Sequence, residues 1–150
     1  MKDMKAEDIY GYVTDKIESM SQDEINTVCQ SILNAPGDRA TVIYFAKAEG
    51  WWFQDIDATC KSILEAPGDV AWAIYCAKRH GWWNQDNEAT CQSILKASGN
   101  RAWTIYCAKR ADWWFQDDET TCQSILEAPG NQASAIYCAR EAGWWVEPNS

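Results

Sequence analysis

Apolar residues recur along the chain with helical spacing, and the same arrangement returns every 31 residues. Between residues 56 and 66, Cys60, Ile63 and Leu64 stand at positions i, i+3 and i+4, which predicts one buried helix face. A turn containing Pro67-Gly68 follows, and then comes a second apolar stripe made of Ala71, Ile74 and Tyr75. Each period therefore predicts two helices joined by a short turn.

Polar residues with capping chemistry stand where these helices are expected to begin. N-caps of the first helices are Asp55, Asp86 and Asp117, with the capping box Ser21-x-x-Glu24 in the first period. N-caps of the second helices are Asp38, Asp69, Asn100 and Asn131. The second helices are expected to end at Gly50, Gly81, Asp112 and Gly143, where a left-handed residue suits the C-terminus.

Four copies of this hairpin fill most of the chain, at residues 21–52, 53–83, 84–114 and 115–147. They share the pattern C-x-S-I-L-x-A-x-G-[DN]-x-A-x-x-I-Y-[FC]-A-[KR], and a fixed period of this length is typical of repeat proteins. Residues 5–20 precede them as an amphipathic cap helix, with Ile9, Tyr10, Val13 and Ile17 on one face. The sequence therefore predicts one all-α domain over residues 1–150, a right-handed solenoid of four repeats with an N-terminal capping helix.

A pair of tryptophans closes each repeat, as Trp51-Trp52, Trp82-Trp83, Trp113-Trp114 and Trp144-Trp145. The first of each pair follows the expected C′ residue, so we expect it to pack back on the repeated alanine of the last helical turn. For the second, a place in the groove between hairpins and a role in partner binding remain equally open.

The last pair has no following repeat to cover it. We expect either that the tail folds back over Trp144 and Trp145 or that a second molecule covers them, since an exposed tryptophan pair is unusual on a monomer. The second alternative predicts a homodimer through the C-terminal end.

Composition narrows the possible partners of this 150-residue chain. A formal charge of −9 opposes direct binding to nucleic acid, and favours a protein partner whose surface is neutral or basic. The opening MKDMKAEDIYGYV has no long apolar run, so we expect no membrane segment and a cytoplasmic location.

The chain has seven cysteines, which recur with the 31-residue period, and two alternatives remain open for their redox state. Cys60 and Cys76 are equally far from Gly68 at the hairpin tip, as Cys91 and Cys107 are from Gly99, and Cys122 and Cys138 from Gly130. Antiparallel helices would hold each pair level and allow a disulfide, but in the cytosol buried thiols are the more common state. Neither C-x-x-C spacing nor a second histidine besides His80 is present, so we expect no metal and no cofactor.

Catalytic motifs are missing from the sequence, which has no glycine-rich phosphate loop, no G-x-S-x-G and no H-E-x-x-H. Paired carboxylates occur only at helix starts, where capping accounts for them. We therefore expect a protein without enzymatic activity.

Candidate binding residues are those in which the repeats differ. One second-helix position carries Thr41, Trp72, Trp103 and Ser134, and another carries Ala48, Arg79, Arg110 and Glu141. We predict that Trp72 and Trp103, with Arg79 and Arg110, contact a partner. An acidic line at first-helix starts, which includes Asp55, Asp86 and Asp117, is the other candidate surface.

In architecture the hairpins resemble α-solenoids of the TPR, Sel1-like and HEAT kind over about residues 21–147. The 31-residue period is shorter than the TPR period of ~34, and the W-x-x-L-G-x-x-Y pattern is absent. The resemblance implies protein binding on a concave face. The first hypothesis is thus a protein-interaction module, and the alternative is a small acidic inhibitor that mimics nucleic acid and blocks a basic enzyme site.

Overall fold

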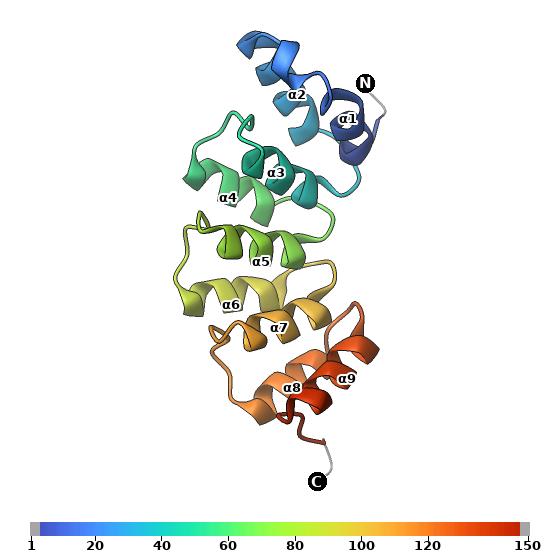
Figure 1. Cartoon of the computed structure of the whole chain (residues 1–150), viewed down its shortest axis with the longest axis vertical. Coiled ribbons are helices and arrows are strands. Elements are labelled where there is room, and N and C mark those ends of the chain that lie inside the picture. The colour runs from blue at the N-terminus through green and yellow to red at the C-terminus, as the bar shows by residue number, and fades with distance from the viewer. Residues whose placement is uncertain (1–3, 148–150) are drawn as a thin grey trace. The chain divides into compact units, whose positions relative to one another are not determined.

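The computed structural model describes residues 4–147, which form nine α-helices, one short 3-10 helix and no strand (Figure 1). The chain divides into two compact units, Met1–Asn84 and Gln85–Ser150. Unit 1 contains α1 (Ala6–Val13), η1 (Ile17–Ser19), α2 (Gln22–Leu33), α3 (Arg39–Ala48), α4 (Ile56–Leu64) and α5 (Val70–His80). Unit 2 contains α6 (Asn87–Lys96), α7 (Arg101–Arg110), α8 (Asp118–Leu126) and α9 (Gln132–Ala142). The boundary between the units lies one residue after the expected boundary between the second and third repeats.

Helix starts are capped as the sequence predicts. Ser21 and Glu24 form the complete capping box of α2, with bonds of 3.2 and 2.8 Å. The side chain of Asp55 accepts a hydrogen bond from the N–H of Ala58 at 2.9 Å, and Asp86 and Asp117 repeat this arrangement. At the second helices the capping side chains are Asp38, Asp69, Asn100 and Asn131.

Helix ends on the tryptophan side are Schellman motifs in all four repeats. In the first, the N–H of Gly50 donates to the Lys47 carbonyl and the N–H of Trp51 donates to the Ala46 carbonyl. Asp112 takes the place of glycine in the third repeat and adopts a φ of 72°, so the left-handed turn persists there. The backbone N–H of the first tryptophan thus bonds to the carbonyl of the repeated alanine, and the packing of its indole on that alanine stays a prediction.

The N-terminal helix is shorter than predicted. It ends at Val13, and Ile17 lies in η1 instead of on the face shared by Ile9 and Val13. Gly11 and the β-branched Val13 and Thr14 are weak helix formers, which accounts for the early end.

Successive hairpins interlock within each unit at the turn between first and second helix. Asp38 caps α3 and also accepts a hydrogen bond of 2.9 Å from the N–H of Asp69 in the next repeat. A Cβ on Gly68, whose φ is +106°, would meet the Asp38 side chain, so this turn requires glycine. Asn100 and Gly130 form the same joint in unit 2.

One isoleucine and one threonine per first helix anchor the core in the later repeats, as in Ile63 and Thr59 of α4, both fully buried. The threonine hydroxyl donates to the Asp55 carbonyl at 2.6 Å, which satisfies its polar group. Leu64 was expected on the buried face, but it is 40% exposed because the helix turns it away from the neighbouring hairpin. The protein is thus all-helical, and within each unit two homologous hairpins stack.

Candidate functional site

Trp72 and Trp103 lie at the third position of α5 and α7. There the backbone N–H of each tryptophan donates a hydrogen bond to the side-chain oxygen of the N-cap residue. The caps are Asp69 for Trp72, at 3.1 Å, and Asn100 for Trp103, at 3.3 Å. Both indoles are half-buried and lie against the tyrosine three residues later, Tyr75 or Tyr106, with ring centroids 5.0 Å apart in each case. Each tryptophan therefore keeps part of its indole accessible while its own helix holds it in place.

Arg79 and Arg110 each follow about two turns further along the same helices, and both are exposed. Trp72, Tyr75 and Arg79 share a face of α5, since they are three and four residues apart. We call this set, together with its counterparts Trp103, Tyr106 and Arg110 on α7, the second-helix face. Trp72 belongs to unit 1 and Trp103 to unit 2.

A hollow of about 440 Å³ adjoins the unit 1 half of the second-helix face. It is lined by Tyr44 of α3 and by Cys76, Arg79 and His80 of α5. Tyr44 stacks on Trp82 at 6.0 Å and meets His80 edge-on at 6.3 Å. Burial and the nearby Cys76 raise the pKa of the Tyr44 hydroxyl, while Arg79 acts in the opposite direction. The hollow thus combines an aromatic wall with the guanidinium of Arg79, a combination suited to a carboxylate or to an aromatic side chain.

Within each unit, the first tryptophan of a repeat stacks on a tyrosine of the helix before that repeat, as Trp82 does on Tyr44 of α3. Trp51 lies against Tyr10 at 6.2 Å, and Trp144 against Tyr106 at 6.1 Å, with nearly parallel rings. Trp51 is buried, whereas Trp82, Trp113 and Trp144 are half-buried. The first tryptophans are therefore less buried than expected. This Tyr–Trp contact was not predicted from the sequence, although a tyrosine and a tryptophan that recur with the same period were a signal for it.

The second tryptophan is the more deeply buried member of the pair. Trp52, Trp83 and Trp114 are 6–8% exposed. The indole N–H of Trp52 donates to the Gln54 side chain at 3.0 Å, and the same oxygen accepts from Ser62 at 2.9 Å. Gln116 joins Trp114 to Ser124 in the same way. Of the two open alternatives, the structure places these second tryptophans inside the fold.

Trp144 and Trp145, the pair that was expected to be covered by a folded-back tail or by a second molecule, are half-buried. Trp144 stacks on Tyr106, and the ammonium of Lys109 lies 5.6 Å from its ring. The indole N–H of Trp145 is buried without a hydrogen-bond partner. Glu147 stands where Gln116 serves Trp114, and its carboxylate accepts hydrogen bonds from Arg140 instead.

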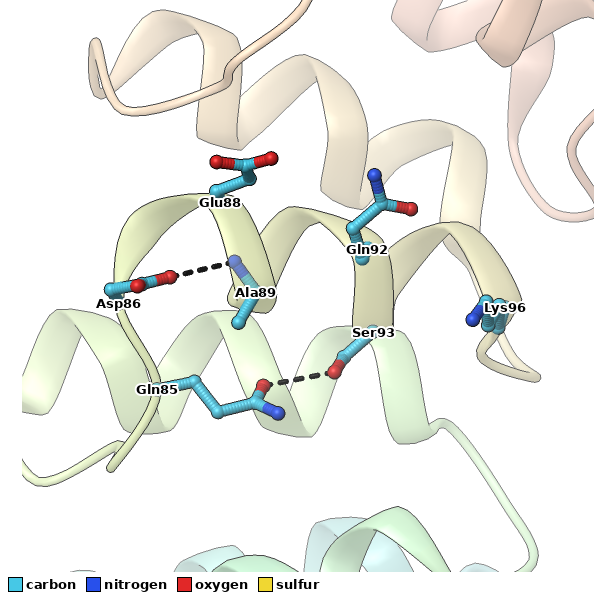
Figure 2. A pocket seen from close by; sticks show the side chains of 7 residues that line it. All are labelled: Gln85, Asp86, Glu88, Ala89, Gln92, Ser93 and Lys96. Atoms are coloured by element: carbon cyan, nitrogen blue, oxygen red, sulfur yellow. Dashed lines mark hydrogen bonds between the residues drawn. The ribbon is translucent and has the colours of Figure 1, made fainter.

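The acidic line consists of exposed carboxylates that also cap helices. Asp55, Asp86 and Asp117 each accept a backbone N–H at 2.8–2.9 Å and remain exposed. The backbone and side-chain hydrogen bonds from Thr120 hold the pKa of Asp117 below its ordinary value. A shallow hollow of about 440 Å³ beside α6 is lined in part by Asp86, Glu88 and Lys96. Figure 2 shows two hydrogen bonds in it, from the N–H of Ala89 to Asp86 and from the hydroxyl of Ser93 to Gln85.

The structure holds all seven cysteines as thiols, the reduced alternative of the two that the sequence allows. Each first-helix thiol donates to the carbonyl of the first tryptophan in its repeat, at 3.5–3.9 Å, as Cys60 does to Trp82. The Cys122 sulfur also accepts the N–H of Val146 at 3.3 Å. Burial raises the pKa of Cys29 to about 11 and also raises the pKa of Cys60 and Cys122. These cysteines therefore tie the tryptophan segment to the first helix.

Further features bear on metals and membranes. Within residues 4–147, no three His, Cys, Asp or Glu side chains come together as a metal site would require. Over the same residues, every helix is too short or too polar to cross a bilayer.

Comparison of the chain with protein-family models, with curated proteins and with solved structures finds no match. The geometry of the chain itself therefore supplies the argument for function.

Proposed function

We propose that this chain is a non-enzymatic protein-binding module, in which the four repeats continue as one right-handed solenoid and a partner docks on the second-helix face. The observation that carries the proposal is the pair Trp72 and Trp103, half-accessible at a position where the outer repeats fold with Thr41 and Ser134. The fold thus does not require an indole there. Tryptophan and arginine are the residue types that dominate binding energy at protein interfaces.

The chemistry of this face and of the whole chain defines the partner. Trp72 and Trp103 offer flat apolar surface, and the stacked tyrosines limit the rotamer entropy that binding would cost. The formal charge of −9 favours a partner whose overall surface is neutral or basic. Thiols throughout the chain support a cytoplasmic setting.

The test replaces Trp72 by the photo-crosslinking residue benzoylphenylalanine, with the same residue at Gln92, exposed on α6, as the control position. A partner crosslinked from position 72 and not from position 92 is then purified for affinity measurements. We expect Trp72→Ala to weaken its binding at least about 30-fold, the loss typical of a hot spot.

Thr41→Ala and Ser134→Ala are matched controls, since they change the same helical position in the outer repeats. They are expected to change affinity less than about twofold. Equal effects at all three positions, with circular dichroism unchanged, would contradict a role for the second-helix face.

The exposed carboxylates at first-helix starts favour a second candidate, an acidic inhibitor of a nucleic-acid-handling enzyme. Glu88→Gln and Glu119→Gln remove charge from this line without removing a capping side chain. If this candidate holds, the two changes together weaken binding to the captured partner and weaken it more at low than at high ionic strength. Binding that is insensitive to both changes and lost in Trp72→Ala leaves only the first candidate.

A further inference from the structure

A carboxylate of the chain itself fills a small aromatic site in the first repeat. Glu49 follows α3, and one of its oxygens accepts a hydrogen bond of 2.6 Å from the Tyr10 hydroxyl. The other oxygen accepts a hydrogen bond of 2.9 Å from the indole N–H of Trp51. The two rings that hold the carboxylate are stacked, with centroids 6.2 Å apart and an interplanar angle of 17°. The first repeat therefore shows which group satisfies a stacked tyrosine and tryptophan of this kind.

The second repeat has the same aromatic pair. Tyr44 of α3 and Trp82 stack with ring centroids 6.0 Å apart and an interplanar angle of 19°. The tyrosines of the two pairs hold equivalent places. Each comes four residues after an alanine, Ala6 or Ala40, whose N–H donates to a proline carbonyl in the turn of the following hairpin, at 2.8 and 3.1 Å. We therefore expect the Tyr44 hydroxyl and the Trp82 indole N–H to lie as close together as the two groups that share a carboxylate in the first repeat.

The carboxylate itself is missing from the second pair. His80 stands where Glu49 does, two residues before the first tryptophan, and Arg79 stands in the place of Ala48. The indole N–H of Trp82 is buried, and within residues 4–147 it has no hydrogen-bond partner. A buried donor without an acceptor is costly and uncommon in folded proteins. The second pair thus has donors and an added positive charge where the first pair has its own acceptor.

The hollow of about 440 Å³ in unit 1 gives access to this pair. Tyr44, Cys76, Arg79 and His80 line it, and its volume is in the usual range for ligand sites. A guanidinium in such a place offers a carboxylate both charge and hydrogen-bond donors. Arg79 and His80 are exposed, and exposed side chains change rotamer within nanoseconds, so a ligand can pass them to reach the buried N–H.

We propose that this hollow binds a carboxylate from outside the chain, which accepts hydrogen bonds from the Trp82 indole N–H and the Tyr44 hydroxyl and pairs with Arg79. The bound carboxylate takes the place that Glu49 occupies in the first repeat. Arg79 also belongs to the second-helix face, so the source that we assign is an acidic side chain of the partner docked there, and in this respect the inference rests on the proposed function. A single carboxylate with these contacts is expected to bind weakly, with a Kd of about 1–10 mM.

The site is tested without the partner, by NMR of the ¹⁵N-labelled full chain. The probe is N-acetyl-glutamate amide, whose only charge is the side-chain carboxylate, and the neutral control is N-acetyl-glutamine amide. Trp82→Phe identifies the Trp82 signal among those of the ten indole N–H groups. We expect the probe to move this signal downfield and to saturate, while the signals of Trp52 and Trp72 stay in place. No saturable shift, or an equal shift with the glutamine compound, overturns the proposal.

His80→Glu places a carboxylate where Glu49 stands in the first repeat. We expect the Trp82 signal of this variant to lie downfield before any probe is added, and the Kd of the probe to rise at least about tenfold, because the site is filled from within. His80→Ala is the matched control, since the later repeats carry Ala111 and Ala142 at this position. It is expected to change the Kd less than about twofold. Equal effects of the two changes, with circular dichroism unchanged, overturn the proposal.

The crosslinked partner tests the source of the carboxylate separately from the proposed function. Its affinity is compared for His80→Glu, His80→Ala and Trp72→Ala. We expect His80→Glu to weaken binding at least about tenfold and His80→Ala to leave it nearly unchanged. Loss of binding in Trp72→Ala with no loss in His80→Glu keeps the proposed function and overturns an acidic side chain of the partner as the ligand. Loss in His80→Glu with none in Trp72→Ala supports the carboxylate site and contradicts the role of Trp72.

Discussion

Helices α7 and α9 of unit 2 have closely related sequences and very different surroundings. Both carry the run Ile-Tyr-Cys-Ala, yet Ile105 and Tyr106 are buried whereas Ile136 is half-buried and Tyr137 is exposed. The difference shows that much of the repeat pattern specifies contact with the next hairpin, and only part of it specifies the hairpin itself. Stability in such an array is divided between the repeats and their interfaces.

The largest effect is expected from truncating the same isoleucine on both helices. Ile105→Ala removes fully buried methyl groups and leaves a cavity, which costs about 2–5 kcal/mol of unfolding free energy. Ile136→Ala, at a half-buried site, costs roughly 1 kcal/mol. Urea unfolding followed by tryptophan fluorescence measures both losses. Similar losses at the two positions would mean that the inter-hairpin contact adds little.

A smaller difference is expected between two glycines of positive φ. Gly130→Ala places a Cβ against Asn100 of the preceding repeat and forces a left-handed alanine, with an expected cost of about 2–4 kcal/mol. Gly143→Ala meets no atom within 4 Å, so only the backbone cost of about 1–2 kcal/mol applies. Thermal unfolding of both variants gives the difference. A Gly143 variant as unstable as the Gly130 variant would show that the interlocked turn does not matter.

Next in size is the hydrogen-bond bridge that Trp114 has and Trp145 lacks. Gln116→Ala removes the acceptor shared by the Trp114 indole and the Ser124 hydroxyl, which costs about 1–3 kcal/mol. Gln123→Ala, which removes only an exposed contact with Glu127, is the control and costs less than about 0.5 kcal/mol. Urea unfolding separates the two, and equal losses would contradict a structural role for the bridge.

Local features of the fold were predictable from the sequence, because capping and left-handed ends depend on residues only a few positions apart. Ser21, Asp55 and Asp112 are examples whose roles follow from their own chemistry. The Tyr10–Trp51 stack joins residues far apart in the sequence, and the Gln54 bridge depends on how the second tryptophan enters the core, so spacing alone did not reveal either. The periodicity of apolar residues also did not predict the early end of α1. Ile17 fits the α-helical pattern, yet it lies in the 3-10 helix η1.

The candidate site divides in the same way. The outer repeats carry Thr41 and Ser134 where the inner repeats carry tryptophan. Comparing the repeats of this one sequence therefore shows that the fold does not require Trp72 and Trp103. The stacking on Tyr75 and Tyr106, and the hollow around Tyr44 and His80, needed side-chain positions. The exposure of Tyr137 on α9 could not be predicted from the apolar pattern, because α7 has nearly the same pattern and its Tyr106 is buried.

The smallest effect at neutral pH, and a clear one at high pH, is expected from the buried thiol of Cys29. Burial raises its pKa to about 11 in the folded chain from an ordinary value of 9.0. At neutral pH, well below 9.0, the thiol is protonated in both states and contributes no pH dependence. Between about pH 9 and 11 the unfolded chain loses the proton first, so the free energy of unfolding falls as pH rises. Cys29→Ala removes this component, and the difference between wild type and variant across that range isolates it from other titrating groups. A difference that stays constant from pH 8 to pH 11 would mean that the Cys29 thiol ionises as readily in the folded chain as in the unfolded one, and that its place beneath the Trp51 carbonyl does not shield it.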